Sequence, residues 1–155
     1  GEDETRPVTV DDAYSAQLAF DGGAMGTVEA SRFANGKKND HSIEIHGSTG
    51  SLRFSLERLN ELEVLRGDDR GYQTVLVTDP DDPYVDHWWP PGHVLGWEHT
   101  FVHENYEFLQ LVASGETADE AAETSLASFQ DGLAVQQVLD AIERSDEHGE
   151  WVDLS

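Results

Sequence analysis

Apolar and polar residues alternate along the first half of the chain, and this alternation predicts β-strands. Tyr14, Ala16, Leu18 and Phe20 fall on one side of the first segment, opposite Ser15 and Gln17. A period of two residues is typical of a half-buried strand. It recurs at residues 24–33, 42–46, 52–56, 62–64 and 72–78. Short turns, such as Asp21-Gly22-Gly23, predict antiparallel pairing of successive strands.

The second half of the chain changes to a helical period. One helix is expected from about Trp97 to Ser114, because Gly115 is a typical helix end. A longer second helix, which ends before Gly149, is predicted by an apolar stripe: Leu126, Phe129, Leu133, Val138, Ala141 and Ile142. Residues 1–155 therefore predict a single α+β domain. We expect an open-faced, mainly antiparallel sheet of about six strands, with two helices packed on one face.

The charge is strongly acidic. Asp and Glu total 32 against 9 Lys and Arg, which gives a net charge of −23. The acids are spread along the chain, which favours a surface adapted to molar salt, as in halophiles. A protein that binds cations or a basic partner would usually concentrate its acids. Nucleic-acid binding is disfavoured, because phosphate contacts need clustered Lys and Arg.

The absence of cysteine, of a long apolar run and of a signal peptide bears on where the protein works in the cell. The chain has no cysteine, which excludes disulfides and thiolate metal sites. It has no apolar run long enough to cross a membrane and no signal peptide at its N-terminus. We therefore expect a cytoplasmic protein.

Three stretches resemble the C-terminal domain of the Gfo/Idh/MocA oxidoreductases, which include glucose-fructose oxidoreductase and inositol dehydrogenases. They are DGGAMGTVEASRFANGKKN at residues 21–39, IEIHGSTGSLRF at 43–54 and SFQDGLAVQQVLDAIERSDEHGEWVDL at 128–154. The second is similar to the family signature "i.i.G..Gsl.f". Together with WWPPGH and EHTFVHE, the similarity covers nearly the whole chain.

The resemblance implies a two-domain enzyme in which an N-terminal Rossmann domain binds NAD or NADP. That domain's Gly-rich loop and the family's catalytic Glu-Lys-Pro motif do not occur in this sequence. We therefore expect no catalytic residue and no bound cofactor here, and a chain that is inactive without its Rossmann partner. The family's open sheet face serves subunit association. The resemblance therefore implies a homodimer or homotetramer whose contact surface is the open face of the sheet, with the residues Glu29, Ser31, Phe33, Glu44, His46 and Arg53.

The histidine-rich aromatic segment at residues 87–109 holds the candidate substrate contacts. An indole face of Trp88 or Trp89 can stack on a sugar or cyclitol ring while His93 hydrogen-bonds a hydroxyl. These tryptophans could instead anchor the loop against a partner domain. Arg32 and Lys37 are rare cations that could meet a polyol or the cofactor, or could lie at a solvated loop tip.

His99 and His103 are four residues apart and share a helix face. His99 is a further candidate for substrate binding. With His93 or Glu107 the two histidines could instead hold zinc, although two histidines alone are not a closed ligand set.

Three functions remain open from the sequence. The first is an NAD(P)-dependent oxidoreductase of sugars, inositols or related polyols, to which this chain supplies the substrate side and the oligomer surface. The second is a stand-alone carbohydrate-binding or assembly module without enzymatic activity. The third is a metal-dependent hydrolase that uses His93, His99 and His103.

Overall fold

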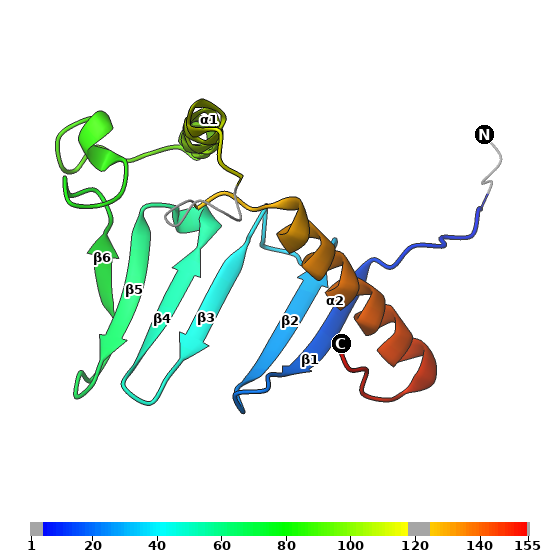
Figure 1. Ribbon diagram of the computed structural model, residues 1–155. Coiled ribbons are helices and arrows are strands. Elements are labelled where there is room, and N and C mark those ends of the chain that lie inside the picture. The colour runs from blue at the N-terminus through cyan, green and yellow to red at the C-terminus, as the bar shows by residue number, and fades with distance from the viewer. Residues whose placement is uncertain (1–4, 118–124, 155) are drawn as a thin grey trace. The chain divides into compact units, whose positions relative to one another are not determined.

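The computed structural model describes residues 5–117 and 125–154, which divide into two compact units (Figure 1). One unit comprises residues 1–37 and 135–155, and the other comprises residues 38–134. The prediction of an α+β fold, with antiparallel strands followed by two helices, is confirmed.

The first unit contains a β-hairpin of β1 (Ala13–Ala19) and β2 (Met25–Ser31). In register, Ala16 lies opposite Val28 and Gln17 lies opposite Thr27. Every second residue of β1 is half-buried, beginning with Tyr14, as the alternation predicted. Most of α2 (Phe129–His148) also belongs to this unit, and it carries the buried Ala141.

The second unit contains a four-stranded antiparallel sheet in the order β3-β4-β5-β6, whose strands run side by side in Figure 1. The strands are β3 (Ser42–His46), β4 (Gly50–Ser55), β5 (Glu61–Arg66) and β6 (Gln73–Leu76). The 3₁₀ turn η1 (Leu56–Arg58) joins β4 to β5. A second 3₁₀ turn, η2 (Val85–His87), and the helix α1 (Trp97–Ser114) follow the sheet.

The strand pairing differs in one respect from the single sheet of about six strands that the sequence predicted. The strands form a two-stranded and a four-stranded sheet. A tight turn at residues 47–49 forces β3 to pair with β4, whereas β2 and β3 are separated by the long polar segment 32–41. A connection of that length does not impose pairing on the strands that it joins.

The register of the four-stranded sheet separates an apolar face from a polar face. Ile43 pairs with Phe54 and Ile45 with Leu52, while Glu44 pairs with Arg53 on the opposite side. Gly50 begins β4 where the strands approach closely, since a Cβ atom there would lie 2.5 Å from the carbonyl oxygen of Leu65. This contact explains why the motif GSTGSLRF has glycine at that position.

Both helices have identifiable ends. The C-cap of α1 is Gly115, in the left-handed conformation with φ 76°, and its N–H donates to the carbonyl of Leu111. Ser128 caps α2, because its hydroxyl accepts from the Asp131 N–H while the Asp131 carboxylate accepts from the Ser128 N–H. Within residues 5–117 and 125–154, neither helix is both long and apolar enough to cross a membrane.

Burial in the second unit is greatest beside the aromatic segment. In the described part of the chain, the buried residues are Thr78, Val85 and Ala141. Thr78 and Val85 flank the acidic loop that leads into the aromatic segment. The best-packed part of this unit therefore supports the segment that carries the candidate site.

Candidate functional site

The two adjacent tryptophans occupy different environments. Trp88 is half-buried, and its indole Nε1–H donates a hydrogen bond of 2.7 Å to Nε2 of His103. Its ring also meets His99 edge-on, with centroids 4.6 Å apart. Trp89, in contrast, is 68% exposed. Trp88 therefore anchors the turn before α1 to that helix, while the indole ring of Trp89 is exposed to solvent.

The two helix histidines are held as hydrogen-bond acceptors. Nδ1 of His99 accepts from the backbone N–H of Gly96 at 3.0 Å, and Nε2 of His103 accepts from Trp88. The proton of each neutral ring is therefore on the other nitrogen. Burial is the main cause that lowers the pKa of His103 below its ordinary value, and unfavourable electrostatic interactions with His99 and His87 contribute to the same direction. These contacts favour the neutral imidazole.

Tyr84 also contacts His103 and completes an aromatic cluster with Trp88 and His99. Its ring stacks on the imidazole of His103 with centroids 4.4 Å apart and an interplanar angle of 19°. Its hydroxyl donates to Oε1 of Glu107 at 2.6 Å, and this bond raises the pKa of the phenol. Tyr84 adopts the left-handed conformation with φ 67°, which is costly for a residue other than glycine. The surrounding contacts must therefore outweigh the backbone strain.

The exposed part of the segment is a tight turn that carries His93. Gly92 has φ 90°, and the N–H of His93 donates to the carbonyl of Pro90, as in a type II turn. Nδ1 of His93 also lies 2.7 Å from that carbonyl oxygen. Since a carbonyl oxygen only accepts, the ring proton is on Nδ1, which leaves Nε2 as the acceptor of the neutral ring. The ring lies 6.2 Å from that of Trp89 at 32°. Trp89 and His93 are called the Trp89–His93 shelf below.

Two residues that the sequence did not single out hold this segment to the sheet. Asn60 exchanges two hydrogen bonds of 2.8 Å with the backbone of Leu95. The hydroxyl of Thr78 accepts from the N–H of Gly92 at 3.2 Å. Both partners are distant in sequence, so periodicity carries no signal for them. The sequence could have indicated these two residues only by their type, because Asn60 lies in a turn and Thr78 follows the end of an apolar strand.

The structure brings only some of the predicted substrate contacts together. Trp88, Trp89, His93 and His99 lie in one segment of the second unit, whereas Arg32 and Lys37 belong to the first unit. The polar atoms of Trp88 and His99 described above are used by contacts within the segment. The role of these residues in substrate binding stays a prediction.

The metal hypothesis gains no support from the geometry. Across residues 5–117 and 125–154, no three His, Asp or Glu side chains are grouped so that they could hold a metal ion. The nitrogens of His99 and His103 discussed above already accept hydrogen bonds.

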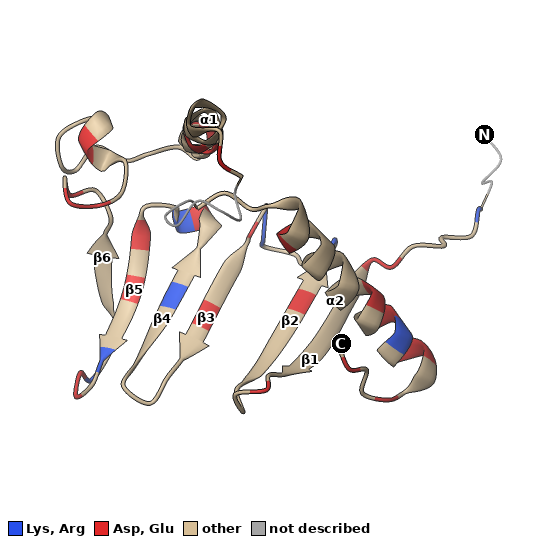
Figure 2. Cartoon of the chain, viewed as in Figure 1, with Lys and Arg blue, Asp and Glu red and all other residues tan. Residues whose placement is uncertain are grey.

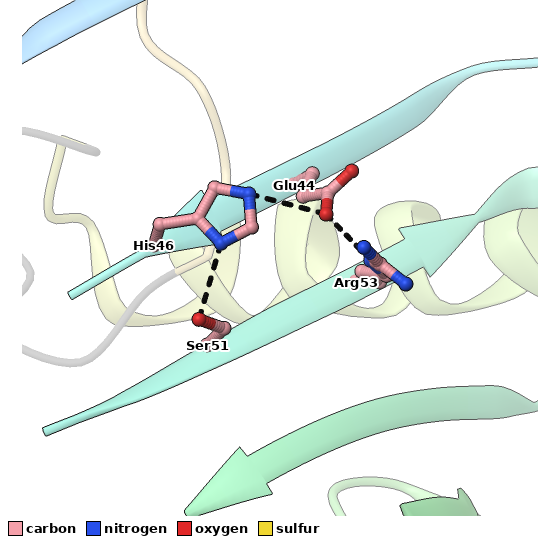
Figure 3. A network of polar contacts seen from close by, with 4 residues as sticks. All are labelled: Glu44, His46, Ser51 and Arg53. Carbon is pink, nitrogen blue, oxygen red and sulfur yellow. Dashed lines mark hydrogen bonds and ion pairs between the residues drawn. The ribbon is translucent and has the colours of Figure 1, made fainter. Parts of the chain in front are cut away.

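The polar face of the four-stranded sheet carries a network of polar contacts among Glu44, His46, Ser51 and Arg53 (Figure 3). Oε1 of Glu44 accepts from Nε of Arg53 at 2.5 Å and lies 3.1 Å from Nε2 of His46, whose Nδ1 is 3.1 Å from Oγ of Ser51. The guanidinium of Arg53 also lies 4.0 Å over the ring of Tyr72. The hydrogen bond with Glu44 is the main cause that raises the pKa of Arg53.

The same face is hollowed beside this network. A shallow depression of about 220 Å³ is lined by residues of β3, β4, η1 and β5, namely Ser42, Ile43, Glu44, Arg53, Phe54, Ser55, Arg58, Glu61 and Glu63. Glu44, His46 and Arg53 share one face of the sheet, and their role in a contact between copies stays a prediction. Glu29, Ser31 and Phe33 lie in the first unit and are exposed, and their membership in one oligomer surface stays a prediction.

Comparison with known proteins gives consistent matches along the chain. Residues 1–154 match the model of the oxidoreductase family, C-terminal alpha/beta domain. Levoglucosan dehydrogenase of Pseudarthrobacter phenanthrenivorans is 38% identical over 159 residues, which cover 99% of this chain and 39% of that protein. A protein of Xenopus tropicalis named glucose-fructose oxidoreductase domain-containing protein 2 is 29% identical over 94% of this chain and 38% of its own length.

Solved structures agree with these matches. An oxidoreductase domain protein from Kribbella flavida superposes with a TM-score of 0.86 at 43% identity, covering 97% of this chain and 39% of that one. A levoglucosan dehydrogenase in complex with NADH and levoglucosan superposes with a TM-score of 0.84 at 37% identity, covering 96% of this chain and 40% of that one. The chain therefore spans about two fifths of the length of these relatives. It belongs to the Gfo/Idh/MocA oxidoreductase family and corresponds to its C-terminal α/β domain.

Proposed function

We propose that this chain is the substrate-side and oligomerisation domain of an NAD(P)-dependent oxidoreductase that acts on sugars, inositols or related polyols. The observation that carries the proposal is the 38% identity to levoglucosan dehydrogenase over 99% of the chain. A related levoglucosan dehydrogenase has been solved with NADH and levoglucosan. A substrate of this protein would have the same chemistry, namely a polyhydroxylated ring with one apolar face.

The Trp89–His93 shelf suits such a ring. The exposed indole of Trp89 offers a flat apolar surface, and Nε2 of His93 can accept a hydrogen bond from a hydroxyl group. A cofactor domain outside this chain would bind NAD or NADP and supply the hydride acceptor. In this proposal the shelf binds and orients the polyol, and it does not act as the base that removes a proton from the substrate.

Exposed apolar side chains on α1 support the proposal that this helix contacts another domain. Trp97, Phe101, Phe108 and Val112 are each about half exposed or more, and they lie on the helix that carries the aromatic cluster. Contiguous exposed apolar surface on a protein usually marks an interaction site. The Rossmann domain of the intact protein is the partner that we propose for it.

The polar sheet face is proposed as the contact between copies of the protein. Glu44 and Arg53 carry opposite charges that face each other on neighbouring strands. In a two-fold contact the same surface meets itself, so each acid can meet the base of the other copy. A homodimer or homotetramer follows from this proposal.

The acidic surface is proposed as an adaptation to high salt in the cytoplasm. Figure 2 shows Asp and Glu on β2, β3, β5 and α2 rather than in one segment. Screening at molar salt shortens the Debye length to about 3 Å and relieves repulsion among the acids. The melting temperature should therefore rise from low salt to molar KCl. A melting temperature that stays constant or falls would refute this part of the proposal.

The activity is tested on the intact protein with a panel of levoglucosan, L-sorbose, glucose and myo-inositol, each with NAD⁺ and NADP⁺. We expect cofactor reduction with at least one member of the panel, and no quenching of NADH fluorescence by residues 1–155 alone. No reduction with any polyol would remove the oxidoreductase proposal. Polyol binding without reduction would favour the stand-alone carbohydrate-binding module.

A further inference from the structure

The side chain of Asn60 binds the backbone of the aromatic segment as another peptide group would. Its Nδ2–H donates to the carbonyl of Leu95, and its Oδ1 accepts from the N–H of Leu95, both at 2.8 Å. Among side chains at neutral pH, a primary amide supplies a donor and an acceptor side by side in this way, whereas an ionised carboxylate only accepts. The carbonyl of Asn60 also accepts from the N–H of Val77, just beyond β6. Asn60 thus links the start of β5 and the end of β6 to the segment.

Thr78 makes the matching contact on the other side of the turn. It is 3% exposed, and its Oγ1 accepts from the N–H of Gly92 at 3.2 Å. A buried hydroxyl is costly unless it is hydrogen-bonded, so this contact stabilises one position of Gly92. Gly92 is the residue whose φ of 90° turns the chain toward His93.

The two contacts enclose the exposed histidine. Gly92 and Leu95 lie on either side of His93 and Val94, and each is tied by its backbone to a residue next to the sheet. His93 is also bonded through Nδ1 to Pro90 within the turn. Neither Asn60 nor Thr78 is part of the shelf itself.

We propose that Asn60 and Thr78 are positioning residues for the substrate, because they fix the turn that presents His93 beside Trp89. The inference rests on the proposed function, in which the Trp89–His93 shelf meets the polyol. A loop without these ties would have to be ordered by the substrate, at a cost in affinity. A displacement of about 1 Å at a site of this kind can lower the rate about 100-fold.

The test uses the intact protein and the polyol of the panel that it oxidises fastest. Thr78→Val keeps the shape of the side chain and removes the acceptor, whereas Thr78→Ser keeps the hydroxyl. Asn60→Asp removes the donor to Leu95, and Asn35→Asp, at an exposed loop position, makes the same change in charge. The measurements are the KM for polyol, the KM for cofactor and the melting temperature of each variant.

We expect Thr78→Val and Asn60→Asp to raise the KM for polyol about 10-fold or more, with the KM for cofactor unchanged. Thr78→Ser and Asn35→Asp should stay close to the parent protein. If Thr78→Val does not fold, Asn60→Gln is the second variant, since it keeps the amide but displaces it by one methylene. A rise in both KM values together would indicate a merely structural role and overturn the proposal.

Combination with Trp89→Ala separates this inference from the proposed function. If Thr78 acts through the shelf, Thr78→Val should change the KM for polyol much less when Trp89 is already alanine. If each substitution instead raises the KM for polyol by the same factor with or without the other, Thr78 does not act through the shelf and the inference is wrong. If Trp89→Ala strongly raises the KM for polyol and Thr78→Val does not change it, the inference about Thr78 is wrong, but the proposed function stands. A Trp89→Ala variant without effect would overturn the shelf and the inference together.

Discussion

The indole Nε1–H of Trp88 donates a 2.7 Å hydrogen bond to Nε2 of His103, fifteen residues further along the chain. This bond joins the proline-rich turn to the second turn of α1. Because the imidazole is half-buried, a lost donor leaves an acceptor poorly solvated. Trp88 therefore has a structural task, although its neighbour Trp89 has the same residue type and nearly the same sequence context.

Replacement of Trp88 by phenylalanine should destabilise the protein by about 1–2 kcal/mol, because the N–H donor to His103 and part of the aromatic surface are lost. The measurement is thermal or urea unfolding of the intact protein. Trp89→Phe is the matched control, since Trp89 is exposed, and its effect should stay within about 0.5 kcal/mol. Equal effects of the two substitutions would contradict the different roles of the tryptophans.

The neutral state of His103 should make stability depend on pH. Burial lowers the pKa of His103 in the folded protein below its ordinary value of 6.5. Its contribution is therefore fully present above about pH 6.5 and is lost as the pH falls through the folded pKa. Unfolding measured between about pH 8 and pH 5 should show a stability difference between the parent and His103→Gln that shrinks in acid.

His41→Gln is the control for this pH series, because His41 is exposed. The stability difference attributed to His103 should change with pH more than the difference measured with this control. A His103→Gln profile that runs parallel to the parent would show that protonation of His103 does not weaken the cluster.

Gly50→Ala should destabilise the four-stranded sheet by about 1–3 kcal/mol, because the new Cβ atom would lie 2.5 Å from the carbonyl oxygen of Leu65. That oxygen is backbone, so relief requires β5 to move. Gly71→Ala is the control, since nothing lies within 4 Å of a Cβ atom there. The urea midpoints of both variants decide the matter, and a Gly50→Ala midpoint equal to that of the parent would contradict the close approach.

The alternation of apolar residues was sufficient to predict the strands, because side-chain period and burial are linked in each strand separately. It could not predict that β2 and β3 lie in different sheets, since pairing across the polar segment 32–41 depends on contacts outside both strands. Gly115 ended α1 as expected, because a left-handed C-cap favours glycine.

The candidate site was predictable only as a segment. Pro90, Pro91 and Gly92 indicated a turn from local backbone preferences alone. The hydrogen bonds that divide the tasks of Trp88 and Trp89 join residues that become neighbours only in the folded chain. The same holds for Asn60, which contacts Leu95 across 35 residues. The left-handed Tyr84 was equally unpredictable, because bulky residues rarely adopt that conformation.

The polar sheet face predicts a change in association when Arg53 is reversed in charge. Arg53 lies between Glu44 on β3 and Glu63 on β5 in register. With Arg53→Glu, the three adjacent positions 44, 53 and 63 of that row would all be acidic and would repel a second copy. Sedimentation of the intact protein should shift from the oligomer toward the monomer, more strongly at low salt than at high salt.

Arg70→Glu makes the same change in charge at an exposed position of the β5–β6 turn. It should leave the oligomer intact. If the two variants sediment alike, the polar face is not the contact between copies.

We propose that this domain binds one side of a sugar or polyol while a separate domain binds the nicotinamide cofactor. The most direct measurement is the steady-state kinetics of Trp89→Ala in the intact protein, with the polyol and the cofactor varied in turn. We expect the KM for polyol to rise about 10-fold or more while the KM for cofactor stays as in the parent. An unchanged KM for polyol, or a change confined to the cofactor, would contradict this proposal.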